Sequence, residues 1–183
     1  MKPSGQSLLE TVFAIGILLI VVAAILGLTK ANLVGQQESE FQVLANNLAR
    51  EGIEVVRLVR DSNWLAGVPW NTGLDGGLTA VVDFNSAAGD WTIVFNPTVI
   101  GQKLYTDANG TFSHNPTGNP TLLSRVVNLA SICQDFSGVE IITTDTTDCD
   151  GPSYGLEVRS VVSWEERGLN RLVTLQDLLY AWK

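Results

Sequence analysis

The chain has 183 residues and a formal net charge of -8 at pH 7, from 19 acidic and 11 basic residues. That length leaves room for one domain of ordinary size beside an N-terminal anchor. The basic residues are scattered and form no stripe, which argues against binding of nucleic acid through a basic face.

The first element is an apolar segment close to the N-terminus. Residues 12–28 carry no charge, and about 17 residues in a helix span roughly 26 Å, near the lower limit for crossing a bilayer. Glu10 precedes this segment, and a carboxylate within lipid costs about 2.5–3.5 kcal/mol on insertion scales. No Ala-x-Ala pattern follows at residues 28–32, as a cleaved signal peptide would require. A plain signal anchor tolerates that absence but leaves Glu10 unexplained.

The junction before the apolar segment, residues 2–10 with the sequence KPSGQSLLE, resembles the processing site of type IV prepilins and type II secretion pseudopilins. In that family a peptidase cuts after a glycine on the cytoplasmic side, and the fifth mature residue is a glutamate. The resemblance implies a leader of residues 1–5, cleavage between Gly5 and Gln6, and an assembly role for Glu10. Gln6 and Ser7 stand where the family usually has phenylalanine and often threonine, which leaves N-terminal methylation open.

A cut after Gly5 has chemical consequences that can be stated separately from the resemblance. It creates an α-amine on Gln6 with a pKa of about 8, which is mostly protonated at neutral pH. A carboxylate inside the membrane needs a partner, and the amine of a neighbouring subunit could pair with Glu10 and fix the axial register. The alternative is that Glu10 only interacts with the N-terminal dipole of an anchor helix.

An amphipathic pattern follows the apolar segment after Lys30. Phe41, Leu44, Leu48, Val55 and Val59 recur at helical spacing and predict one buried face. Gly52 falls on the same stripe and is expected to allow close packing against the head. The predicted organisation is a hydrophobic helix over residues 6–30 that continues as an amphipathic helix over residues 31–63.

The remaining residues, 64–183, predict a β-rich head. Gly, Asn, Asp and Pro separate short runs of β-favouring residues, which predict strands over residues 78–84, 91–95, 103–106, 122–129, 139–143, 155–164 and 171–175. One long helix followed by strands predicts an α+β fold in which the helix packs on an antiparallel sheet, as in pilins.

Turns and the C-terminal segment complete the predicted head. Turns are expected at Asn109-Gly110 and at residues 168–170. Residues 175–182 are expected to form a short helix or a final strand, with Leu178, Leu179 and Trp182 facing the core.

Two cysteines, Cys133 and Cys149, bracket a loop of the head. In an exported head they could form a disulfide, and closing a loop of about 15 residues gives roughly 3 kcal/mol in the chain-entropy model. In a cytosolic protein two free thiols would be expected instead.

An acidic turn contains Asp145, Asp148 and Asp150, followed by Gly151. Some pseudopilins bind calcium in C-terminal loops of this kind, and closely spaced carboxylates suit that cation. The spacing does not match an EF-hand loop, and the alternative is a solvated turn without metal. Calcium is the one cofactor that the sequence suggests.

Catalytic patterns are missing from the sequence. His114 is the only histidine, lies in a polar loop and is expected to be solvated, so no Ser/His/Asp or Cys/His arrangement can be argued. No Gly-rich phosphate loop follows a strand. An enzyme is therefore not expected, and the five tryptophans are interpreted as core or interface anchors: Trp64, Trp70, Trp91, Trp164 and Trp182.

The sequence thus predicts a structural subunit, a minor pilin or pseudopilin. Residues 44–64 also resemble, more weakly, minor pilins of the pilus-modification and type II secretion kinds. The expected partners are prepilin peptidase, other pilin or pseudopilin subunits and the inner membrane. A single pass through the cytoplasmic (inner) membrane with the head outside would precede incorporation into an extracellular or periplasmic filament. The alternative is a signal-anchored envelope protein whose head binds a ligand or a surface. Adhesion, motility, DNA uptake and secretion are all left open.

Overall fold

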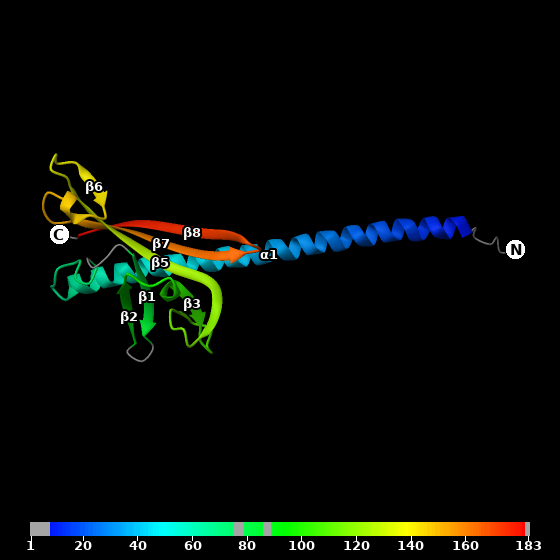
Figure 1. Cartoon of the computed structure of the whole chain (residues 1–183), viewed down its shortest axis with the longest axis horizontal. Helices are drawn as coiled ribbons and strands as arrows, with labels where there is room; N and C mark the ends of the chain where they lie inside the picture. Colours follow the sequence, from blue (N-terminus) through cyan, green and yellow to red (C-terminus); the bar gives the residue numbers. More distant parts are fainter. Residues whose placement is uncertain (1–7, 75–78, 86–88, 182–183) are drawn as a thin grey trace. The chain divides into compact units, whose positions relative to one another are not determined.

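The structure, a computed structural model, describes residues 8–74, 79–85 and 89–181. The chain divides into two compact units, Met1–Gln42 and Val43–Lys183. The described residues of the first unit are all helical. The second unit, called the head below, contains the C-terminal turns of the same helix and an antiparallel sheet (Figure 1).

The helix α1 runs from Leu8 to Leu65 and is 58 residues long. No proline interrupts it, and it ends two residues beyond the predicted stop. Gly67 then adopts a positive φ of 70°, and the Val68 N–H donates to the carbonyl of Asn63 at 3.1 Å. A left-handed glycine after the last turn, with Pro69 shortly beyond it, is a common way to end a helix.

The buried face of α1 lies within the head and is rich in small residues. It consists of Ala45, Leu48, Ala49, Gly52, Ile53, Val55, Val56 and Arg60. The prediction is confirmed for Leu48, Gly52 and Val55, whereas Leu44 and Val59 are only half-buried. The centre of the face is displaced toward the alanines because small side chains let the helix approach the sheet closely.

Eight strands are found within the described residues, and all of their pairings are antiparallel. They are β1 (Thr79–Asn85), β2 (Asp90–Phe95), β3 (Lys103–Thr106), β4 (Phe112–Ser113), β5 (Asn119–Gln134), β6 (Glu140–Thr143), β7 (Gly155–Glu166) and β8 (Leu169–Tyr180). Two 3-10 turns lie between them, η1 (Ile100–Gln102) and η2 (Thr146–Asp148). The sequence predicted every strand except the two-residue β4, although β5 and β8 are longer than expected.

Strand β5 is the centre of the sheet. One of its edges pairs with β7 from Leu123 to Ile132. Its other edge pairs in turn with β3, β1 and β6, and β2 and β8 extend the sheet from β1 and β7 (Figure 1). An antiparallel sheet with one packed helix confirms the predicted α+β, pilin-like architecture.

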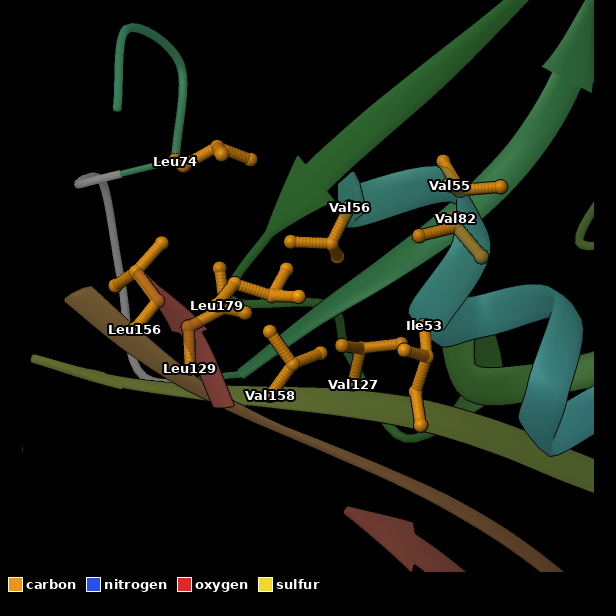
Figure 2. Packing of buried hydrophobic residues seen from close by; sticks show 10 residues of the cluster. All are labelled: Ile53, Val55, Val56, Leu74, Val82, Val127, Leu129, Leu156, Val158 and Leu179. Carbon is orange, nitrogen blue, oxygen red and sulfur yellow. The ribbon is translucent and has the colours of Figure 1, made fainter. Parts of the chain in front are cut away.

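The core of the head lies between the helix and one face of this sheet. Ile53, Val55 and Val56 of α1 point toward strand residues that include Val127, Val158 and Leu179 (Figure 2). Val56, Val127 and Val158 are fully buried. The C-terminal turns of α1 are therefore part of the core of the head, and the compact unit begins at Val43.

The C-terminal segment corrects one prediction. Residues up to Tyr180 continue β8, so neighbouring side chains point to opposite faces of the sheet. Leu179 is 2% exposed and Leu178 is 41% exposed; the expectation that Leu178 faces the core is wrong. The preceding turn lies at Arg167 and Gly168, whose φ angles are 53° and 76°.

The tryptophans play different parts in the head. Trp164 is buried, and Trp70 and Trp91 are half-buried against the core. Trp64, at the end of α1, is exposed. Trp182 lies outside the described residues.

Candidate functional site

The candidate assembly segment is the N-terminal part of α1. Gly5 and Gln6, the predicted cleavage site, lie outside the described residues. Glu10 lies in the first turn of α1 and is exposed. Glu10 and Lys30 are the only charged residues between Leu8 and Glu38.

The apolar side chains of this segment are exposed on all sides of the helix. They include Leu9, Val12, Phe13, Ile15, Ile17, Leu18, Leu19, Ile20, Ile25, Leu26 and Leu28, each at least half exposed. The segment has a mean hydropathy of 2.9, and none of it is buried. Since exposed apolar surface of this extent is rare in soluble monomers, lipid or other helices would have to cover it. The helix is long and apolar enough to cross a membrane.

A buried arginine of the sheet forms hydrogen bonds to the helix. The sequence pattern alone did not identify this residue. Arg125 of β5 is completely buried. Its guanidinium donates to Glu51 Oε1 at 2.5 Å and to the carbonyls of Leu48 and Val82 at 3.3 and 2.7 Å. One side chain thus links β5 to both α1 and β1. A possible signal was present, because Arg125 occupies the inward-facing position between Leu123 and Val127 in an alternating strand.

Gly52 marks the closest approach of α1 to the sheet. A Cβ at this position would stand 2.5 Å from Ser160 Oγ of β7 and 3.1 Å from a methyl carbon of Val127 in β5. The predicted close packing at Gly52 is confirmed.

Cys133 and Cys149 are joined by a disulfide with a Cα–Cα distance of 5.7 Å. Cys133 is buried near the end of β5, and Cys149 follows η2. The bridge therefore closes the loop that contains β6.

The acidic turn is organised by its own hydrogen bonds. The carboxylate of Asp145 accepts from the hydroxyl and the backbone N–H of Thr147 at 2.7 and 2.9 Å, and these bonds lower the pKa of Asp145 below its ordinary value. Asp148 accepts from the Thr143 hydroxyl at 2.8 Å, and the Asp150 N–H donates to the Gln134 carbonyl. Among the described residues, no three His, Cys, Asp or Glu side chains form a group that could hold a metal ion. Calcium at this turn stays a prediction.

The environment of His114 differs from the solvated one expected from the sequence. The side chain is half-buried, its Nδ1 lies 3.1 Å from the carbonyl of Lys103, and its backbone N–H donates to Asp83 Oδ1 at 3.2 Å. Burial, assisted by the nearby positive charge of Arg125, lowers the pKa of His114 to about 4. The polar composition of the loop predicted a solvated side chain. The burial was missed because the carbonyl that the ring contacts, that of Lys103, lies on β3, 11 residues earlier in the chain.

This pKa shift predicts a stability change in mild acid. His114 stays neutral in the folded head, whereas the unfolded chain gains a proton as the pH falls through about 6.5. The free energy of unfolding is therefore unaffected by His114 above that pH. It decreases as the pH falls from about 6.5 to about 4, where the folded head also takes up the proton. At pH 5.5 the loss should be roughly 1 kcal/mol after allowance for partial exposure, or about 2–4 °C in melting temperature.

Thermal melts of the full-length chain in detergent at pH 7 and pH 5.5 measure this loss. His114 is the only histidine, and carboxylates of ordinary pKa remain ionised over this interval. The variant His114→Asn should show a smaller decrease. Equal decreases in both proteins would contradict the assignment.

Comparison with known proteins gives no match to this chain among family models, curated proteins or solved structures. Function is therefore inferred from its residues and their geometry alone.

Proposed function

We propose that this chain is a structural filament subunit, a minor pilin or pseudopilin of a type IV pilus or a type II secretion-like filament. The observation that carries this proposal is the N-terminal part of α1. It places a single carboxylate, Glu10, in the first turn of a helix whose next charged residue is Lys30. The apolar surface between them is exposed, as expected of a segment that is covered first by lipid and then by other subunits.

The mechanism is assembly rather than catalysis. Prepilin peptidase would cut after Gly5 at the inner membrane and leave a protonated amine on Gln6. Glu10 of one subunit would pair with that amine of its neighbour, because an unpaired carboxylate in an apolar environment is unfavourable. The pairing sets the axial register, while the apolar helices form the filament core and the head faces outward. Cleavage without methylation is sufficient for this step.

The test is the N-terminal residue and intact mass of the full-length chain recovered from cells that contain a prepilin peptidase. A chain that begins at Gln6 supports the proposal, and an extra methyl group would identify N-methylation. A chain that still begins at Met1 would instead indicate a plain signal anchor with a ligand- or surface-binding head. A chain that begins near Ala31 or Asn32 would indicate an ordinary signal peptide.

Assembly is tested separately from cleavage. Glu10→Gln should be cut normally but should be reduced at least tenfold in the filament fraction sheared from cells, because the charge pair is worth at least about 1.4 kcal/mol. The matched control is Glu40→Gln, an exposed glutamate of the same helix outside the apolar segment, which should enter the fraction like the wild type. Equal recovery of both variants would refute the role of Glu10.

A further inference from the structure

The head contains a polar cleft between the β1–β2 hairpin and the β3–β4 hairpin. Its volume is about 540 Å³, which falls within the range of small-molecule sites. Two carboxylates, six amide or hydroxyl side chains and one aromatic ring line it. None of the structural features described above accounts for this concentration of hydrogen-bonding groups.

The two carboxylates are held in fixed orientations. Asp83 Oδ1 accepts from the backbone N–H groups of Phe84 and His114 at 3.1 and 3.2 Å. Asp107 Oδ1 accepts from those of Asn109 and Thr111, both at 2.8 Å. Within the described part of the chain these bonds use only one oxygen of each carboxylate, which leaves the second oxygen of each as an acceptor for a ligand.

The charge of the lining restricts the ligand. Among the residues that the structure describes, no Lys, Arg or His lines it, so phosphates and other anions would be repelled. The described residues bring no three His, Cys, Asp or Glu side chains together, so a bare metal ion would have at most two carboxylates here. A ligand that donates hydrogen bonds to carboxylates is favoured.

The neutral polar groups point to a ligand with many hydroxyls. Asn109 carries a donor and an acceptor side by side, which matches adjacent hydroxyls on a sugar ring. The Asn115 oxygen accepts from the N–H and hydroxyl of Thr117 at 3.1 and 3.0 Å, which leaves its amide group as a donor. The Thr92 hydroxyl donates to the Asp83 carbonyl at 3.2 Å and can still accept, and the Ser113 hydroxyl accepts from the Asn115 N–H at 3.3 Å and can still donate. A small cation would use the carboxylates alone.

An aromatic ring completes the lining. Phe84 is 37% exposed, and its ring lies 5.3 Å from that of Trp91 at an interplanar angle of 57°. Tilted aromatic pairs at this distance are favourable, so Trp91 helps to fix the Phe84 ring.

From this geometry we infer that the cleft binds a neutral saccharide. Asp83 and Asp107 accept hydrogen bonds from its hydroxyls, and the amide and hydroxyl groups of the lining donate to it. The inference is independent of the proposed filament function, because it involves no residue of the apolar segment of α1.

Saturation-transfer difference NMR on the full-length chain tests the site. The probes are glucose, galactose, mannose and N-acetylglucosamine, with spermidine as a cationic comparison, in a detergent that contains no sugar. At least one saccharide should receive saturation from the protein. Asp83→Asn and Asp107→Asn keep the oxygen that holds each turn but lose the charge, and each should weaken binding about tenfold or more.

Asp135→Asn is the matched control. Asp135 organises the β5–β6 turn in the same way, accepting from the N–H groups of Ser137 and Val139 at 2.8 and 2.9 Å, but it does not line the cleft. This variant should bind the saccharide like the wild type. The inference is overturned if no saccharide receives saturation, if the two cleft variants bind as well as the control, or if spermidine alone binds.

Discussion

Replacement of Arg125 by methionine is expected to destabilise the head by about 2–4 kcal/mol, because it removes the fully buried partner of an ion pair with a partly exposed glutamate and leaves two backbone carbonyls without their donor. The substitution keeps an unbranched side chain of similar length. It leaves Glu51 without its cation and the carbonyls of Leu48 and Val82 without their donor. The melting temperature of the full-length chain should decrease by on the order of 10 °C.

Near-UV circular dichroism in detergent follows this transition through the tryptophans of the head. Arg50→Met is the matched control, since Arg50 is an exposed arginine of α1 and its replacement should change stability by less than about 0.5 kcal/mol. Arg125→Lys should recover only part of the loss, because an ammonium cannot reproduce the planar fork of donors. Equal melting temperatures for the Arg125→Met and Arg50→Met variants would show that the buried pair does not stabilise the head.

The second large effect is expected for Gly52→Ala. Alanine normally improves a helix interior by about 1 kcal/mol relative to glycine, but the new Cβ would stand 2.5 Å from Ser160 Oγ. Forcing apart a packed helix and sheet typically costs about 1–3 kcal/mol. The net result should be a decrease of several degrees in the melting temperature.

Gly35→Ala is the control for helix propensity, because no heavy atom lies within 4 Å of a Cβ at Gly35, and it should be neutral or stabilising. Ser160→Ala removes the obstructing hydroxyl, which is buried and has no hydrogen-bond partner among the described residues. The double variant Gly52→Ala, Ser160→Ala should therefore recover much of the stability lost by the single one. If the two effects simply add, contact with Ser160 is not the cause.

Much of the fold could be predicted from the sequence because its patterns are local. The helix follows from an uninterrupted periodic stretch, and the strands follow from β-favouring runs between Gly, Asn and Pro. Boundaries were less predictable: β8 continues to Tyr180 through pairing with β7, which no local pattern specifies. The burial of Ala45 and Ala49 rather than Leu44 depends on how closely the helix approaches the sheet.

The polar interior was the least predictable part of the head. Arg125 and His114 are ordinary surface residues by composition, and their burial depends on partners more than 10 residues away, such as Leu48 and Lys103. The cleft was also missed, because Asp83 and Asp107 come together only when two hairpins pack against the same strand. By contrast, a short contiguous motif was enough to suggest a role for Gly5, Gln6 and Glu10.

The central position of β5 has a consequence for the order of folding. The β1–β2, β3–β4 and β7–β8 hairpins pair residues close in sequence and can form early, since short loops cost little entropy to close. None of these hairpins can join another except through β5, which pairs with β1, β3, β6 and β7. The pairing of Thr79 with Asn128 closes a long loop, so docking of the hairpins onto β5 is expected to be the slow, cooperative step. Until then the backbone N–H and C=O groups on both edges of β5 are unpaired. We therefore expect this strand to be the most aggregation-prone part of the newly synthesised head.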